Sequence, residues 1–136
     1  MSIIVTGADG YIGWPTALRI AKRTDERVVL VDNFGRRDWV SGVGSKSATP
    51  IAEMETRINA AEEVHDLRNL SFVYGDLVDR SFVDQLLRVH EPRAIVHTAA
   101  QPSAPYSQIN GERANFTQHN NMQATRNLAF GLAEND

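Results

Sequence analysis

Three glycines, Gly7, Gly10 and Gly13, follow an apolar segment near the start of the chain, and they constrain the fold more than any other feature. Residues 2–6 read SIIVT, which is typical of a buried β-strand. The apolar positions over about 11–23 predict a helix that packs on this strand. Because glycine has no side chain, the three positions allow a sharp turn and a close approach to the backbone. The sequence therefore predicts a strand, a tight glycine loop and a helix in direct succession.

The alternation of strand and helix continues along the rest of the chain. Further strands are predicted over 27–32, 70–74 and 94–97, and further helices over about 50–66 and 80–90 and from about 113 to the C-terminus. Residues 33–48 are rich in Gly, Ser and Arg and predict a long loop, in which Trp39 is an anchor without aromatic neighbours. Strands that alternate with helices in this way indicate right-handed parallel βαβ units covered by helices on both faces. The predicted fold class is therefore α/β, a doubly wound parallel sheet of the Rossmann type, of which this chain supplies the N-terminal four-strand portion.

Composition places the chain among single-domain proteins. With 136 residues, 42% of them hydrophobic, and a formal net charge of −3, it matches one globular domain over 1–136. The acidic balance argues against nucleic acid as a partner, and no apolar run approaches the roughly 20 residues of a membrane span. We therefore expect a cytoplasmic protein whose partner is a small molecule. The chain has no cysteine, and its histidines lack ligand-like spacing, so no metal site is predicted.

The glycine loop and the second strand together predict a dinucleotide site. In a βαβ unit this loop lies at the N-terminus of the first helix, where unpaired N–H groups and the helix dipole favour a pyrophosphate. Gly7 would allow the turn, Gly10 would let the backbone reach the phosphates, and Gly13 would let the helix pack closely. Asp32 ends the second strand about 20 residues on, where a carboxylate can accept hydrogen bonds from the hydroxyls of the adenosine ribose.

Asp32 also predicts which dinucleotide binds. Its negative charge would repel the extra phosphate of NADP, which favours NAD as the cofactor. Arg36 and Arg37 would instead favour NADP, because guanidinium groups commonly bind a ribose phosphate. The alternative is that both arginines only solvate a loop. The sequence thus predicts NAD, with Asp32 as the deciding residue.

The TGxxGxxG spacing at 6–13 resembles that of the extended short-chain dehydrogenase/reductase family, whose members are largely NAD-dependent nucleotide-sugar epimerases and dehydratases. Further similar pieces are GDL after the third strand, HTAA after the fourth strand and NNMQAT in the last helix. The resemblance implies an NAD-dependent enzyme of nucleotide-sugar metabolism. It places the cofactor against a set of residues that follow the strands, namely Gly7, Gly10, Tyr11, Ile12, Gly13, Asp32, Asn33, Arg36, Asp76, Leu77, Ala99, Ala100, Gln101 and Asn120.

A narrower resemblance rests on the pieces GADGYIGWPTAL, VDNFGRR, ATPIAEMETRI, QPSAPYSQI and TQHNN. They are similar to a subgroup of this family that builds the sulfonated sugar donor of sulfolipid from UDP-glucose and sulfite, with transient oxidation of the sugar at C4 by NAD. The resemblance implies UDP-glucose as the substrate, Ser103 and Tyr106 beside it, and a homodimer of the full-length protein. Pro102 stands where this subgroup would have an arginine. A generic nucleotide-sugar 4-epimerase or 4,6-dehydratase is therefore an alternative.

The family's chemistry needs a Tyr-x-x-x-Lys pair, in which the lysine lowers the pKa of a tyrosine that acts as the base. This sequence contains no such pair, because proline, valine and asparagine stand four positions after Tyr11, Tyr74 and Tyr106. No catalytic residue is therefore assigned. We interpret the sequence as the NAD-binding part of a longer enzyme, without its C-terminal catalytic and substrate part. A non-catalytic NAD-binding module or an inactive truncated product is the remaining alternative.

Overall fold

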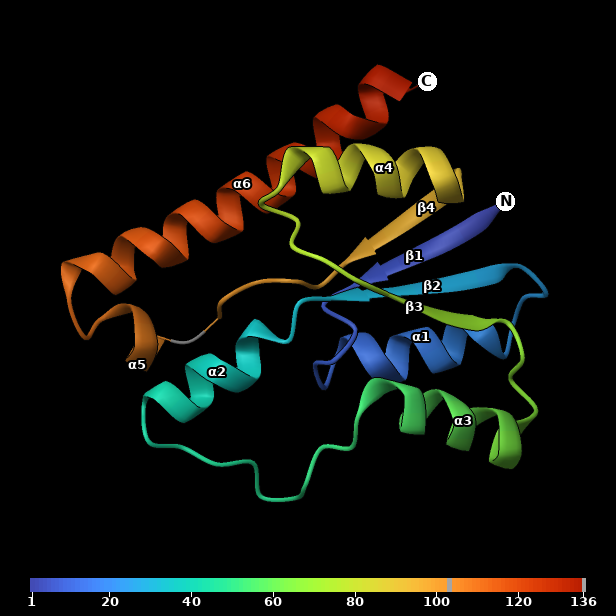
Figure 1. Ribbon diagram of the computed structural model, residues 1–136, viewed down its shortest axis with the longest axis horizontal. Helices are drawn as coiled ribbons and strands as arrows, with labels where there is room; N and C mark the ends of the chain where they lie inside the picture. The colour runs from blue at the N-terminus through green and yellow to red at the C-terminus, as the bar shows by residue number, and fades with distance from the viewer. Residues whose placement is uncertain (103, 136) are drawn as a thin grey trace.

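Four parallel strands form the sheet at the centre of the computed structural model, which describes residues 1–102 and 104–135. The order across the sheet is β3-β2-β1-β4. Val5 of β1 is paired with Leu30 of β2 and with Val96 of β4. Because all pairs are parallel, the carboxyl ends of the strands lie at one edge of the sheet (Figure 1). The strands are β1 (Ser2–Thr6), β2 (Arg27–Asp32), β3 (Leu70–Tyr74) and β4 (Pro92–His97).

Helices cover both faces of this sheet, as Figure 1 shows. Side chains of β2 alternate between two cores: Val28 and Leu30 pack with α1 and α3, whereas Val29 and Val31 pack with α4 and α6. All four side chains are fully buried. The predicted doubly wound α/β architecture is confirmed, because strands that are apolar on both faces require helices on both sides. These helices are α1 (Gly13–Ala21), α3 (Met54–His65), α4 (Arg80–His90) and α6 (Gly111–Asn135).

Most predicted elements are present, some with shifted ends. β1, β2, β3 and α4 have the predicted limits, whereas α1 is shorter than 11–23 and the helix predicted over 50–66 begins only at Met54. β4 begins at Pro92, which pairs with Ser2, because proline is tolerated at the first position of a strand. α6 begins two residues earlier than predicted, and the side chain of Asn110 accepts a hydrogen bond from the amide of Arg113 (2.9 Å) at its start. Among the helices that the structure describes, none has the length and apolar character that a membrane crossing requires.

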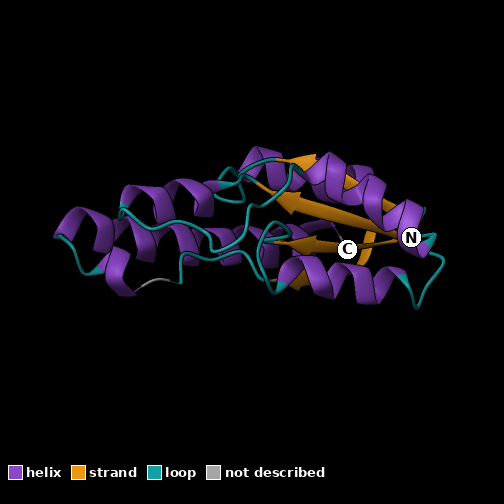
Figure 2. Cartoon of the chain, turned by 90° about the horizontal axis from the view of Figure 1, so that it is seen from below, coloured by secondary structure: helices purple, strands orange, loops and turns teal. Residues whose placement is uncertain are grey.

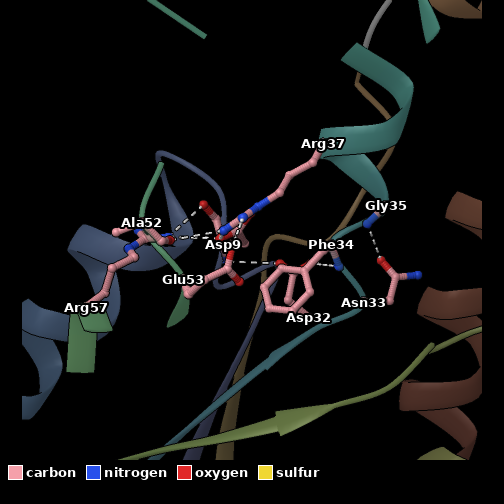
Figure 3. Close-up of polar contacts among 9 residues, drawn as sticks. All are labelled: Asp9, Asp32, Asn33, Phe34, Gly35, Arg37, Ala52, Glu53 and Arg57. Atoms are coloured by element: carbon pink, nitrogen blue, oxygen red, sulfur yellow. Dashed lines mark hydrogen bonds and ion pairs between the residues drawn. The ribbon is translucent and has the colours of Figure 1, made fainter. Parts of the chain in front are cut away.

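The predicted loop over 33–48 contains a helix, α2 (Gly35–Gly42), so this prediction is wrong for its first half. Two local features start the helix. Phe34 has a φ of 60°, and the side-chain oxygen of Asn33 accepts a hydrogen bond from the Gly35 amide (2.9 Å). Arg37 then ties the helix to Asp9, as Figure 3 shows. These contacts compensate for a sequence of weak helix propensity.

Trp39 of α2 lies in an aromatic cluster, which contradicts the prediction that it has no aromatic neighbours. Its ring centroid lies 6.2 Å from that of Tyr106 in α5 (Ala104–Ser107) and 5.6 Å from that of Phe116 in α6. We call these three residues the Trp39 cluster. Both views show α2, α5 and the first turns of α6 extending beyond the carboxyl ends of the strands (Figure 1 and Figure 2). The Trp39 cluster therefore joins three helices at the end of the sheet where its loops emerge.

Candidate functional site

A cleft of about 450 Å³ lies at the carboxyl edge of the sheet. β1 and β4 are neighbours in the sheet, whereas β1 connects through α1 to β2 on its other side. The chain therefore leaves these two strands in opposite directions, which opens a crevice of the kind that binds ligands in α/β proteins. Loops after all four strands contribute to its wall, which consists of Gly7, Asp9, Gly10, Tyr11, Ile12, Gly13, Val31, Asp32, Asn33, Arg36, Trp39, Gly75, Asp76, Leu77, Thr98, Ala99, Ala100, Pro102, Asn120 and Ala124.

All of the residues predicted to hold the cofactor line this cleft except Gln101. Gln101 is buried, and its backbone forms two hydrogen bonds with the side chain of Asn121 (2.8 and 3.1 Å). Of the two residues predicted near the substrate, Ser103 lies outside the described residues. Tyr106 packs in the Trp39 cluster, with the guanidinium carbon of Arg113 4.8 Å from its ring centroid. The structure thus brings the predicted cofactor residues together, while their binding role stays a prediction.

The structure gives a different reason for glycine at each of the positions 7, 10 and 13. Gly7 has a φ of +69°, and a Cβ on it would lie 2.6 Å from the backbone nitrogen of Ala99. A Cβ on Gly13 would lie 2.1 Å from the carbonyl oxygen of Gly7. A Cβ on Gly10 would meet only that same oxygen, at 3.2 Å. The fold therefore requires glycine at 7 and 13, whereas the packing of the protein itself leaves more room at 10.

The N-terminus of α1 offers free amide groups to the cleft. Tyr11 and Ile12 line the cleft, and their side chains are exposed. Among the described residues, no acceptor is paired with the backbone N–H of either one, whereas the amides of Gly10 and Trp14 are both paired within the loop. Unpaired amides at a helix N-terminus, together with the helix dipole, form an anion site.

Asp32 ends β2 with its carboxylate in the cleft wall. Oδ2 accepts a hydrogen bond from the amide of Asp9 (2.9 Å), and Oδ1 accepts one from the amide of Phe34 (2.8 Å). Burial raises the pKa of Asp32, although these amide hydrogen bonds favour the ionised form. A carboxylate can accept about four hydrogen bonds, so acceptor capacity is left for a ligand hydroxyl.

Asp9 is the charged residue of the cleft that the sequence analysis missed. Its side chain is only 6% exposed and accepts two hydrogen bonds from Arg37, both of 2.8 Å, and one from Arg57 of 2.9 Å (Figure 3). The bonds to Asp9 raise the pKa of Arg37, whereas burial lowers that of Arg57. Arg37 is therefore engaged in a partly buried ion pair rather than solvating a loop. Arg36 is exposed and lines the cleft.

Two loops of the cleft are held by structural hydrogen bonds. Thr98 donates its hydroxyl to the carbonyl of Thr6 (2.6 Å), and the hydroxyl of Thr6 is bonded to Nδ1 of His97 (2.7 Å). Burial lowers the pKa of His97, which favours the neutral ring. Asn127 of α6 is buried and donates its side-chain amide to the carbonyls of Leu77 (2.8 Å) and Val78 (2.9 Å). The side chain of Asn127 thus holds the loop that follows β3 against α6.

Replacing Asn127 by leucine is expected to lower the free energy of unfolding by about 1–3 kcal/mol, because the buried carbonyl of Leu77 and the half-buried carbonyl of Val78 lose their donor. The measurement is urea unfolding followed by circular dichroism. Asn115→Leu, at an exposed position of the same helix, is the matched control and should change stability by less than about 0.5 kcal/mol. Equal stability of the two variants would contradict this role of Asn127.

The model of the NAD-dependent epimerase/dehydratase family matches residues 3–135. The chain belongs to this family. The resemblance inferred from the glycine spacing and from the GDL and HTAA pieces is therefore confirmed, as is the fold that it implied.

Individual relatives of the family agree with this assignment. The UDP-sulfoquinovose synthase of Sulfolobus acidocaldarius is 39% identical over 136 residues, which cover 100% of this chain and 34% of that protein. The chloroplastic UDP-sulfoquinovose synthase of Spinacia oleracea is 38% identical over 132 residues, which cover 97% of this chain and 27% of that protein. The Bordetella bronchiseptica enzyme WbmH, solved in complex with NAD⁺, has a TM-score of 0.63 and 28% identity over 98% of this chain and 35% of its own. This chain thus spans about a third of the length of these relatives.

Proposed function

We propose that this chain binds NAD and forms the cofactor-binding part of an enzyme that modifies a nucleotide sugar. The observation that carries the proposal is the position of Asp32 in the same cleft as the free amides of Tyr11 and Ile12. A dinucleotide needs both an anion site for its pyrophosphate and an acceptor for its ribose hydroxyls. The family membership of the chain and the NAD⁺ bound to WbmH support the same cofactor.

The remaining cleft residues fit the two ends of such a cofactor. Asp76 is exposed in the loop after β3 and would accept a hydrogen bond from the adenine amino group, with Leu77 beside the ring. Ala99 and Ala100 are small and would let the nicotinamide half lie along the end of β4. When bound, NAD supplies a hydride acceptor. The residues of this cleft would bind and orient that acceptor.

Calorimetry with NAD and NADP tests the proposal. We expect the unmodified chain to prefer NAD, because Asp32 accepts the ribose hydroxyls and repels a 2′-phosphate. Asp32→Ala should narrow this preference by at least about tenfold, or ~1.4 kcal/mol. Asp25→Ala removes an exposed carboxylate outside the cleft and should leave the preference unchanged. Equal affinities of the unmodified chain for NAD and NADP would contradict the assignment of Asp32.

We further propose that the substrate is UDP-glucose and the second reactant sulfite. The identities of 39% and 38% to two proteins named UDP-sulfoquinovose synthase support this choice. Mass spectrometry of the products that the full-length protein forms from UDP-glucose, NAD and sulfite is the test. A UDP-sugar that carries a sulfonate group is the expected product. A chromatographic step before the mass spectrometer separates the epimers, so a new UDP-sugar peak of unchanged mass would identify a 4-epimerase. Loss of one water would identify a dehydratase.

Pro102 favours a different function, that of a generic nucleotide-sugar 4-epimerase or 4,6-dehydratase that does not use sulfite. It lines the cleft, and it cannot present the positive charge that an arginine at this position would offer to an anion. The same product analysis separates the two functions. A chain without product in either reaction, but with bound NAD, would instead support a non-catalytic NAD-binding module.

A further inference from the structure

A second cavity of about 600 Å³ adjoins the cleft on the side of α2. The two share Asp9, Gly10, Tyr11 and Arg36 in their walls, so they meet at the glycine loop. Arg37 and Lys46 also line the second cavity, which makes its wall rich in positive charge. Among the described residues, no carboxylate is ion-paired with Arg36 or Lys46.

The backbone of Asp9 places this cavity next to the ribose acceptor. The amide of Asp9 donates to Oδ2 of Asp32 at 2.9 Å, so residue 9 touches the carboxylate that we assign to the ribose hydroxyls. Asp9 also lines the second cavity, so this cavity adjoins the place that we assign to the ribose and to any phosphate on its 2′-oxygen. Arg36, Arg37 and Lys46 give the second cavity the basic wall that would attract such a dianion.

The side chain of Asp9 acts against such a phosphate. It holds the guanidinium of Arg37 through two bonds of 2.8 Å and that of Arg57 through one of 2.9 Å (Figure 3). The forked donors of Arg37 would otherwise match a phosphate in two-point geometry. A 2′-phosphate would therefore meet a buried carboxylate in addition to Asp32, with the strongest nearby donors already used.

We propose that Asp9 is a specificity-determining residue that excludes NADP by occupying the guanidinium groups of Arg37 and Arg57. The inference rests on the proposed function, because it concerns which dinucleotide the NAD cleft accepts. Two carboxylates then share the discrimination of NAD from NADP. Asp32 binds the ribose hydroxyls directly, and Asp9 keeps the adjoining basic cavity from serving as a phosphate site.

Asp9→Asn tests this inference, because asparagine keeps the shape and the backbone amide of residue 9 but removes the charge. Calorimetry with NAD and NADP should show the affinity ratio shifting toward NADP by at least about tenfold, or ~1.4 kcal/mol. Arg37→Gln is the second variant and should act in the opposite direction, because it leaves the Asp9 carboxylate less neutralised. NADP binding should weaken relative to NAD in that variant.

The two variants separate specificity from a merely structural role of the ion pair. A structural role would lower the affinity for both dinucleotides in both variants, and this result would overturn the inference. An unchanged ratio in Asp9→Asn with NAD still bound would also overturn it while leaving the proposed function intact. If Asp9→Asn does not fold, the direction of change in Arg37→Gln decides. Failure of the unmodified chain to bind either dinucleotide would overturn the proposed function, and this inference with it.

Discussion

Replacing Gly10 by valine is expected to abolish NAD binding while the fold is retained. The added side chain would enter the space where the backbone approaches the pyrophosphate, because Gly10 lines both the cleft and the adjoining cavity. Its Cβ would meet only one protein atom within 4 Å, the carbonyl oxygen of Gly7 at 3.2 Å. We expect an affinity loss of at least about a hundredfold, or ~2.7 kcal/mol, by calorimetry.

The far-ultraviolet circular dichroism of this variant should match that of the unmodified chain. Gly111→Val is the matched control, since a Cβ on Gly111 meets no atom within 4 Å and this residue lies at the start of α6, outside the cleft wall. It should bind NAD as the unmodified chain does. Retained affinity in Gly10→Val would show that this glycine serves only the turn.

Replacing Gly13 by alanine, in contrast, should lower the stability of the fold itself rather than act only on NAD binding. The new methyl group would lie 2.1 Å from the carbonyl oxygen, and 2.8 Å from the carbonyl carbon, of Gly7. These are backbone atoms that cannot rotate away, so the loop or α1 must move. Overpacking of this kind costs about 1–3 kcal/mol and occasionally more, and we expect the upper end of that range or failure to fold.

Urea unfolding measures the effect on Gly13. Gly42→Ala is its matched control, because Gly42 also lies in a helix and a Cβ there meets nothing within 4 Å. That control should be neutral or stabilising by up to about 1 kcal/mol, since alanine favours a helix more than glycine does. A stability of Gly13→Ala equal to that of the control would refute the close contact between α1 and Gly7.

These two predictions give Gly10 a role in binding and Gly13 a role in stability, a distinction that the spacing of the glycines alone does not test. The sequence assigned the turn to Gly7, and the φ of +69° agrees. It assigned Gly13 to the packing of helix on strand, and the structure narrows this to a contact with the carbonyl of Gly7 itself. A spacing pattern reports where a side chain is missing. The atoms that would collide with it become visible only once the loop is folded.

The order of strands and helices followed from the sequence alone, because it depends on local patterns. Continuous apolar runs such as 28–31 predict strands buried on both faces, and apolar spacing such as that over 80–90 predicts the helices between them. For the same reason the residues at the carboxyl ends of the strands could be named, since parallel strands bring their ends to one edge.

Only the tertiary structure decided how α2 and the arginines are used. α2 is stabilised by contacts to distant residues, the ion pair of Arg37 with Asp9 and the packing of Trp39 on Tyr106 and Phe116. Asp9 and Arg57 are separated by 48 positions, so no periodicity in the sequence connects them. Local patterns determine where strands and helices form, because hydrogen bonding and burial repeat along each element. Charge pairing between separate elements depends on their positions in space, which the packing of the two cores determines.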